Sequence, residues 1–577
     1  MKRRYAGWVA LAATGIVVSA ELTGTAFAQN RPVTGSNTVG GNPLGGNPLD
    51  ALPQINAPQK APSVSVQVQP QAPQLQQLLA THITPSTFKV EGVKSIPFDE
   101  VAKRFAPLAH RDITIGELIE TANGVTRLYQ ERGYALSFAF VPAQDFADGV
   151  VRITVVEGYV SNVKITGKPG ALEDKIRAIA AHIVADRPLR TATFQRDINV
   201  LGLLPGLKVS ANVPPPTSTD GATTLELDAQ HKAFDVSTGI DFNHPGVQGL
   251  LTLTENGLTP FGEQLSFSAL LPKGRDNITY LAAHAAVPIA SDGLTAKVDA
   301  THYRGNPVDN PGLPSYVERT VISDKITGAL SYPLLLSNTR SVVGTVSAYA
   351  AHDEDRYRNT INGLQYGETS QVRVLQLQAD YAEVKPGQVR KASVAIAKAF
   401  NILGASKGAD TNIAGLTLAN PVSLNFVRTN ASFSQTNDWP LGFGTAFAVT
   451  GQFSAVSLPT SEQIAFGAQR FANGYQPGEA SGDSGWGASI ELNHPFALGH
   501  AWLQTLTPYV SFDMARVYLH AGTPSPSRLS SASIGLRISD GKYYSLDLSV
   551  AKALADAPVE SPSRSPRVNA TFSYQLN

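Results

Sequence analysis

Three short sequences present a serine or a histidine in a setting that hydrolytic enzymes use. Gly404-Ala405-Ser406-Lys407-Gly408 has the spacing of a nucleophile elbow, which requires a strand before the serine and a helix after it. Gly482-Asp483-Ser484-Gly485 offers a second nucleophile, and Ala282-Ala283-His284 offers a base. The residues after Gly408 predict a loop, and Trp486 stands where serine proteases have glycine. A chain with 49 glycines contains such matches by chance, so we expect no catalytic site and no enzyme.

The residue types that bind metals and nucleic acids are absent or dispersed. The 577 residues include no cysteine, which excludes disulfides, thiol nucleophiles and Cys-ligated zinc. The 11 histidines are scattered, with no pair at the i, i+4 spacing of helical metal sites. The 46 basic and 46 acidic residues cancel, so no global positive field favours nucleic acid. We expect no metal, no cofactor and no nucleic-acid partner.

Residues 1–28 predict a cleaved secretory signal peptide. Three basic residues precede the apolar residues 6–20, and Ala26-Phe27-Ala28 is a small-x-small cleavage sequence. Residues 29–84 are rich in Pro, Gln, Gly and Asn and contain Gly-Gly-Asn-Pro-Leu twice. Because this composition buries too little apolar surface to offset the entropy of ordering, it predicts a linker. A short helix is expected within it, at residues 75–79.

Residues 85–158 predict a small α+β module with the element order β-α-α-β-β. Thr114 followed by Glu117 is a capping box that starts a helix, and Gly133 stands where that helix must end. Two segments of alternating apolar residues follow the helix and predict a hairpin. Residues 159–231 repeat the same order, which indicates a second copy of the module in tandem.

From residue 232 to residue 577 the helical periodicity is replaced by alternation. The last segment shows this best, with apolar residues at positions 568, 570, 572, 574 and 576 and polar residues between them. No run of about 20 apolar residues occurs after the first 30 positions, so no membrane helix is expected. About 345 residues in strands of about ten suit an antiparallel transmembrane β-barrel of about 16 strands. A soluble β-sandwich would also alternate, but it would rarely reach this length without splitting into domains.

Nine short sequences stand in a characteristic order along the chain. They are Leu128-Tyr129-Gln130-Glu131-Arg132-Gly133-Tyr134, Val141-Pro142-Ala143-Gln144-Asp145, Gly149-Val150-Val151, Val156-Glu157-Gly158, Phe194-Gln195-Arg196-Asp197-Ile198-Asn199, Leu204-Pro205-Gly206, Arg470-Phe471-Ala472-Asn473-Gly474-Tyr475, Ser481-Gly482-Asp483-Ser484-Gly485 and Phe512-Asp513-Met514-Ala515-Arg516-Val517. Their order resembles that of the two-partner secretion transporters, the TpsB group, and of its ShlB/FhaC/HecB members most. The resemblance extends from about Thr87 to the end.

This resemblance implies that residues 85–158 and 159–231 are periplasmic POTRA domains, and that the barrel lies in the outer membrane of a Gram-negative bacterium. It implies a transporter that recognises an unfolded exported partner protein and translocates it to the cell surface. The expected partners are this secreted protein, which is large and β-helical, outer-membrane lipid and, during biogenesis, the barrel-assembly machinery. Three alternatives remain at this stage: a barrel-assembly factor, a passive porin, and a surface adhesin or hydrolase.

The resemblance also assigns residues 470–475 to the tip of a long loop that folds into the barrel after strand eleven. In the family, an arginine at this tip pairs with an aspartate on a lumen strand, which is Asp513 here. This chain has Asn473 at the arginine position. An amide can donate a hydrogen bond to a carboxylate but cannot form a bidentate ion pair. We expect a weakened latch formed by Asn473, Gly474 and Tyr475 against Asp513, with Arg470 as a substitute partner.

A POTRA domain offers a sheet edge beside a helix, to which an unfolded segment can add as an extra strand. In the first module, Tyr134, Leu136 and Phe138 are the candidate contacts for the partner protein. The alternative interpretation is that these apolar side chains only fill the core of the module.

Overall fold

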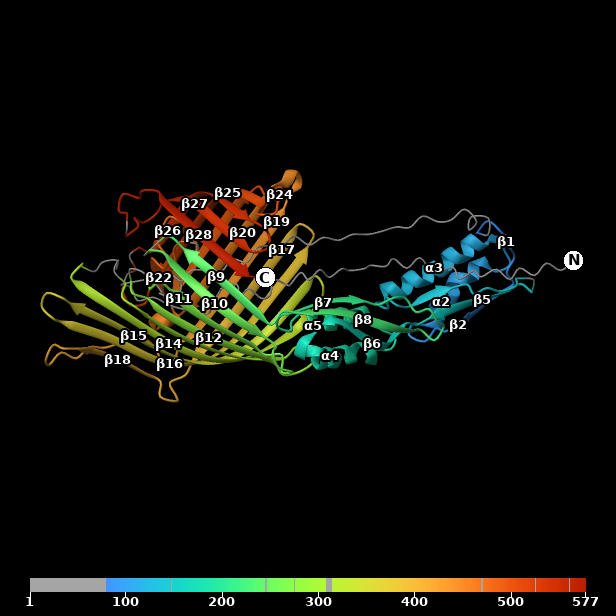
Figure 1. Cartoon of the computed structure of the whole chain (residues 1–577), viewed down its shortest axis with the longest axis horizontal. Coiled ribbons are helices and arrows are strands. Elements are labelled where there is room, and N and C mark those ends of the chain that lie inside the picture. The colour runs from blue at the N-terminus through green and yellow to red at the C-terminus, as the bar shows by residue number, and fades with distance from the viewer. Residues whose placement is uncertain are drawn as a thin grey trace. The chain divides into compact units, whose positions relative to one another are not determined.

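The computed structural model describes residues 79–576, apart from residues 147, 244–245, 274–275, 308–313, 469–470, 523, 525 and 560. The predicted signal peptide, almost all of the predicted linker and the loop residue Arg470 lie outside the described residues. The described chain divides between His231 and Lys232 into an N-terminal unit and a barrel unit, whose elements are labelled in Figure 1.

The first module of the N-terminal unit has the predicted β-α-α-β-β order. Its elements are β1 (His82–Ile83), β2 (Thr87–Glu91), α2 (Phe98–Phe105), η2 (Ala106–Leu108), β3 (Ile113–Thr114), α3 (Ile115–Glu131), β4 (Phe138–Phe140) and β5 (Val150–Val156). Strand β5 lies between β2, which runs parallel to it, and β4, which runs antiparallel. The short strands β1 and β3 form a separate pair.

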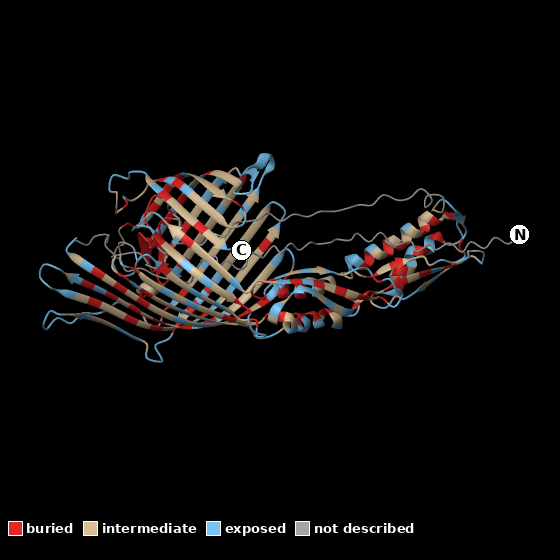
Figure 2. Cartoon of the chain, viewed as in Figure 1, coloured by how far each residue is buried: buried red, intermediate tan, exposed pale blue. Residues whose placement is uncertain are grey.

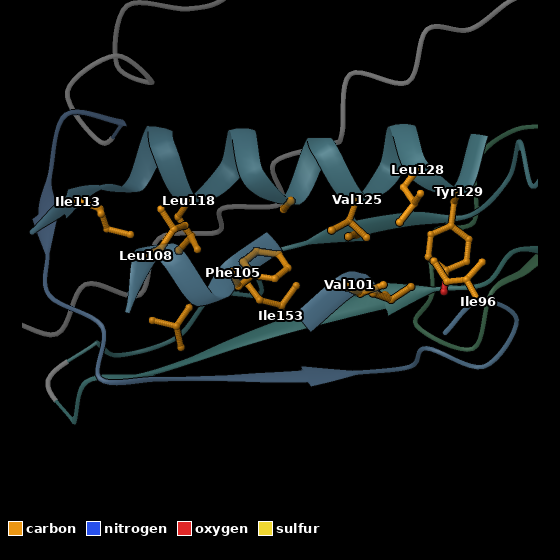
Figure 3. Packing of buried hydrophobic residues seen from close by; sticks show 14 residues of the cluster. Ile96, Val101, Phe105, Leu108, Ile113, Leu118, Val125, Leu128, Tyr129 and Ile153 are labelled. Atoms are coloured by element: carbon orange, nitrogen blue, oxygen red, sulfur yellow. The ribbon is translucent and has the colours of Figure 1, made fainter. Parts of the chain in front are cut away.

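Helix α3 begins and ends where the sequence predicts. The backbone amide of Glu117 donates to the side-chain oxygen of Thr114 at 3.1 Å, which caps the first turn. The chain leaves the helix through Gly133, whose φ of 87° favours glycine. The buried face of the helix, which includes Leu118 and Val125, packs onto the sheet and α2 and forms the core shown in Figure 3.

A half-buried carboxylate fastens the end of this helix to the sheet. Glu157, just after β5, accepts hydrogen bonds from the backbone amides of Lys94 and Ser95, both at 2.7 Å, and from the Tyr129 hydroxyl at 2.8 Å. Burial alone would raise the pKa of Glu157, but these hydrogen bonds to its charged form outweigh burial and lower the pKa below its usual value. The ionised form therefore stabilises the module.

The second module repeats the order with longer strands. Its elements are β6 (Tyr159–Lys168), η3 (Gly170–Leu172), α4 (Glu173–Ala185), α5 (Thr191–Leu201), β7 (Leu207–Asn212) and β8 (Ala222–His231). Strand β8 is central, parallel to β6 and antiparallel to β7. The backbone amide of Thr191 donates to the carbonyl oxygen of Gly133 at 2.7 Å, which joins the start of α5 to the first module.

The barrel unit is a closed antiparallel sheet in which sixteen strands follow one another within the described residues. They are β9 (Phe234–Asp241), β10 (Gln248–Asn256), β11 (Gln264–Leu271), β12 (Thr279–Pro288), β13 (Thr295–Gly305), β14 (Val317–Leu336), β15 (Arg340–Asn359), β16 (Gln365–Lys385), β17 (Gln388–Ala399), β19 (Val427–Asp438), β20 (Gly444–Ser454), β23 (Ser484–Asn493), β25 (Leu503–Tyr518), β26 (Arg528–Ser539), β27 (Tyr544–Ala553) and β28 (Arg567–Leu576). Two short strands extend neighbours: β18 (Ser406–Thr411) pairs with β16, and β24 (Phe496–His500) pairs with β25. A short 3-10 turn, η4 (Pro440–Gly442), connects β19 and β20.

The alternation predicted from the sequence separates the two faces of the barrel wall. Leu253 and Phe267 are about half exposed on the outer face, at 49% and 50%, while their polar neighbours point inward. The same pattern colours the strands in alternating bands in Figure 2. Strand β28 has the predicted orientation, since Val568 is 69% exposed and Asn569 is buried on the lumen side. Among the described helices, none combines the length and the hydropathy needed to cross a membrane.

This orientation predicts opposite effects of a charge at neighbouring positions of β28. An arginine at lipid-facing mid-depth costs about 2–4 kcal/mol, whereas one in a wet lumen costs little. We expect Phe572→Arg to lower the amount of assembled barrel in outer-membrane fractions much more than Thr571→Arg. Equal assembly of the two variants, measured by heat-modifiable migration on gels, would show that the two faces are assigned wrongly.

Candidate functional site

The connection between β20 and β23, which we call the lumen loop (residues 455–483), is largely buried in its described residues, which exclude 469–470. It contains a short 3-10 turn, η5 (Thr460–Glu462), and a hairpin made of β21 (Ile464–Phe466) and β22 (Ala480–Gly482). We call residues 455–463 its root and residues 467–479 its tip. Figure 1 shows β22 within the outline of the barrel, and the contacts below place the loop against inward-facing wall residues.

The tip packs against one section of the barrel wall. Tyr475 of the tip and Phe466, at the end of β21, are fully buried against Ala515 on β25, Leu529 on β26 and Ala553 on β27. The Tyr475 hydroxyl donates to the backbone carbonyl oxygen of Asp556 at 2.8 Å. Because a buried Tyr needs a partner for its hydroxyl, this bond fixes the depth to which the side chain enters the wall.

Small residues allow the tip to approach the wall closely. A Cβ atom at Gly474 would lie 2.7 Å from the backbone nitrogen of Ala553, a distance at which neither backbone can yield. On β23, a Cβ atom at Gly487 would lie 2.7 Å from the Phe466 ring and 2.9 Å from the Phe471 ring. The fit therefore depends on glycine both in the loop and in the wall.

The tip is strained where it makes these contacts. Phe471 and Ala472 have φ angles of 58° and 134°, in a region that residues with a side chain rarely adopt. Each such conformation costs about 1–3 kcal/mol and persists only when surrounding contacts hold it. Release of the tip from the wall would relieve this strain, so the closed position depends on the packing and on hydrogen bonds.

Asp513 and Asn473 meet, but not as the sequence suggested. We expected the side-chain amide of Asn473 to donate to the carboxylate; instead, the backbone amide of Asn473 donates to Asp513, which is 5% exposed. The side-chain amide of Asn569 on β28 in turn donates to the Asn473 carbonyl oxygen at 3.0 Å. A main-chain donor is available whichever residue stands at position 473, which explains how the contact survives without arginine. The expected substitute, Arg470, lies outside the described residues.

The root of the loop is held by a buried ion pair that sequence reasoning missed. Glu462 is fully buried and lies 2.8 Å from the guanidinium of Arg428 on β19. The Tyr349 hydroxyl on β15 donates to both carboxylate oxygens of Glu462, at 2.9 and 2.8 Å. Removal of one partner from a buried ion pair costs about 3–5 kcal/mol, so this root is firmly attached. No motif marked Glu462, because its partners come from strands more than 30 residues away.

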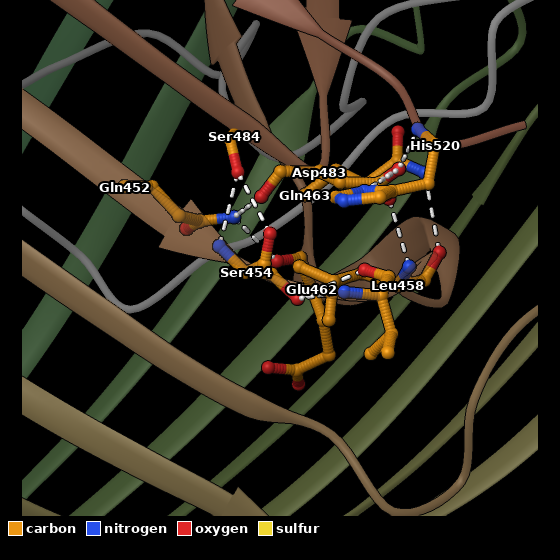
Figure 4. Close-up of polar contacts among 9 residues, drawn as sticks. Gln452, Ser454, Leu458, Glu462, Gln463, Asp483, Ser484 and His520 are labelled. Atoms are coloured by element: carbon orange, nitrogen blue, oxygen red, sulfur yellow. Dashed lines mark hydrogen bonds and ion pairs between the residues drawn. The ribbon is translucent and has the colours of Figure 1, made fainter.

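A second carboxylate joins the root to the neighbouring connections. Asp483 accepts hydrogen bonds from the backbone amides of Leu458 and His520, both at 2.8 Å. The Gln452 side-chain amide donates to the carbonyl oxygens of Glu462 and Asp483, and Ser484 bonds to Ser454, as Figure 4 shows. Asp483 belongs to a motif recognised in the sequence, but its role as a clamp did not follow from that motif.

The hydrolase-like sequences do not come together. Ser406 begins β18 and no helix follows it within the described residues. Ser484 lies on β23, while His284 lies on β12 and pairs with Asp299 on β13. These strands are far apart in the order around the barrel.

The predicted docking residues of the first module differ in their surroundings. Tyr134 packs against the core, with its ring 6.1 Å from that of Tyr129. Leu136 is half-buried and its backbone touches Gly158. Phe138 and Phe140 lie on the same side of β4 with ring centroids 6.0 Å apart, and both are half-buried.

The contact between Asn473 and Asp513 predicts which substitutions open the loop. A hydrogen bond to a charged group contributes about 1.5–3 kcal/mol, and Asp513→Ala removes it whereas Asn473→Ala leaves the backbone donor in place. We expect single-channel recordings to show more frequent opening for Asp513→Ala and wild-type behaviour for Asn473→Ala. Wild-type traces from Asp513→Ala, or equal opening by both variants, would show that the contact does not hold the tip.

Two family models match the chain. Residues 83–158 match the POTRA domain, ShlB-type, and residues 334–538 match the haemolysin secretion/activation protein ShlB/FhaC/HecB. The first match covers the first module, and the second covers the barrel from the end of β14 to β26, including the lumen loop.

Two known transporters are similar to this chain. The heme/hemopexin transporter protein HuxB of Haemophilus influenzae is 21% identical over 482 residues, 79% of this chain and 80% of its own length. The outer membrane transporter CdiB of Escherichia coli is 32% identical over 84 residues, which are 15% of this chain and 14% of that protein. The structure of CdiB from Escherichia coli superposes with a TM-score of 0.65 at 17% identity, over 88% of this chain and 93% of that one. These findings support a two-partner secretion transporter whose first module matches a ShlB-type POTRA domain and whose barrel matches the ShlB/FhaC/HecB family.

Proposed function

We propose that this transporter captures one cognate exported protein in the periplasm through its POTRA modules and conducts it, unfolded, through the barrel to the cell surface. The observation that carries the proposal is a closed barrel with a polar interior and an obstructing loop, on the same chain as two docking modules. A passive porin would not need the modules. A barrel-assembly factor would typically carry three to five of them, whereas two are described here.

The barrel interior suits an extended polypeptide. Ser, Thr, Asn, Gln and Asp recur among the inward-facing residues of the strands, so the backbone of a passing chain keeps polar partners or water. The periplasm offers no ATP, and folding of the partner outside the cell makes its exit effectively irreversible. The closed lumen loop keeps the passage narrow when no partner is present.

We infer that the partner docks on β4 of the first module through Phe138 and Phe140. Strand β4 is at the edge of its sheet, where an extended segment can add. Thr126 of α3 already bonds the backbone of Ala139, the Ala139 amide donating to its hydroxyl at 3.0 Å, which occupies part of that edge. The two Phe rings, on the opposite side of β4 from the buried Ala139, remain available to apolar side chains of the partner. Tyr134 and Leu136 then act mainly by positioning β4.

The role of the modules can be tested by deleting residues 87–231 from the full chain. The barrel should still insert, because its sheet closes on itself without the N-terminal unit. Export of the partner should be lost, because capture in the periplasm is lost. The amount of barrel in outer-membrane fractions is the control, and export at the normal rate by the truncated chain would contradict the docking role.

The two rings can be tested without removing the module. We expect Phe138→Ala with Phe140→Ala to weaken binding of the partner's N-terminal region by about 1–3 kcal/mol, as for loss of interface aromatic side chains. Val150→Ala, at the exposed first position of β5, is the matched control and should bind normally. Isothermal titration with the intact transporter gives both values. Equal binding by both variants would place the docking surface elsewhere.

A further inference from the structure

The lumen loop is attached to one part of the barrel circumference. Its root binds Arg428 on β19 and Tyr349 on β15, and its tip packs against β25, β26 and β27. Inward-facing residues beneath the tip are therefore covered, and Ser531 and Ser533 on β26 are 0% and 7% exposed. The anchors described above all lie on strands β15 to β28, which follow one another around the closed sheet.

The wall formed by β9, β10 and β11 has a different surface. Its inward-facing residues at mid-strand are small and hydroxylated: Ser237, Thr252, Thr254, Ser266 and Ser268, which we call the hydroxyl stripe. Ser237, Thr252 and Ser268 stand side by side in the register of the three strands. Thr252 and Ser268 share a hydrogen bond of 2.8 Å, and Thr254 and Ser266 share one of 3.0 Å. All five residues are half-buried, so solvent or a passing chain reaches them.

The chemistry of this stripe suits a moving polypeptide. A hydroxyl both donates and accepts, so it can bond the N–H or the C=O of any residue that comes past. Each such hydrogen bond joins two uncharged groups, and the passing chain can exchange it for a hydrogen bond to water or to the next hydroxyl. The wall at β23–β27 differs, because Arg537 there bonds Glu491 and Asp547, with the Arg537–Asp547 bond at 3.0 Å. Fixed charges of this kind would hold a charged cargo residue in place.

We propose that the partner protein crosses the barrel in extended form along the hydroxyl stripe of β9–β11, beside the anchored lumen loop. This inference rests on the proposed function and adds the path to it. The hydroxyl stripe does not discriminate between amino-acid sequences, which suits a surface that every segment of a long partner must pass. Recognition of the partner then depends on the POTRA modules.

The chain contains no cysteine, so a single introduced cysteine has no disulfide partner within the chain itself. The partner carries one cysteine and is stalled in transit by a stably folded domain fused to its C-terminus. Ser266→Cys and Thr252→Cys test the stripe, Ser533→Cys is the matched inward serine beneath the loop, and Phe267→Cys faces lipid. We expect disulfide adducts of the stalled partner with Ser266→Cys and Thr252→Cys, and no adduct with Ser533→Cys or Phe267→Cys.

Adducts at Ser533→Cys equal to those at Ser266→Cys would overturn the path, and so would the absence of stripe adducts while the stalled partner is exposed at the cell surface. Those results would leave the proposed function intact, since the partner has then still entered the barrel. Failure of the unmodified transporter to export the partner at all would instead overturn the proposed function.

As a second readout, Ser268→Arg should slow export of the partner, whereas Ser268→Thr should export it normally. The amount of assembled barrel should be equal in the two variants. Normal export by Ser268→Arg would contradict the path.

Discussion

The barrel depends on one constraint: in lipid, every backbone N–H and C=O must bond within the protein. A sheet meets this constraint only if its first and last strands pair, and β9 pairs with β28 from Thr571–Asp241 to Leu576–Val236. Lys232 reaches the carbonyl oxygen of Leu576, and the Asn243 side chain accepts from the Ala570 amide at 2.6 Å, so both ends of the seam are bonded as well. Closure creates an interior, and the interior makes room for a loop and a passage.

The lumen loop combines a firm root with a strained tip. The root places Glu462 between Arg428 and Tyr349, which would leave a buried positive charge without its partner if the root came away. The tip instead relies on close packing against Ala515 and Ala553 and on hydrogen bonds to Asp513, Asn569 and Asp556, none of which is an ion pair. Differences in attachment of this kind suit a loop that shifts at its tip while its root keeps it in the barrel.

The local pattern of residue types was sufficient to predict the two α+β modules and the alternation of apolar and polar residues along the barrel strands. The cap at Thr114, the stop at Gly133 and the two faces of β28 follow from residues within a few positions of one another. The loop and its strand partner Asp513 were found by resemblance. The root was not predicted, because Glu462, Arg428 and Tyr349 are separated by 34 and 113 residues and meet only when the barrel closes. The backbone donor at Asn473 also needed the structure, since no side-chain pattern reports where a main-chain amide points.

The central claim is that the partner passes through the lumen of a barrel that stays closed. Cysteines at the paired positions Gly239 and Ser573 would link β9 to β28 in a chain that otherwise has none. The measurement is the rate of partner export before oxidation, after oxidation and after reduction. Passage through a closed lumen predicts the same rate in all three states. A rate that falls when the seam is locked and recovers on reduction would show that the barrel must open between β9 and β28.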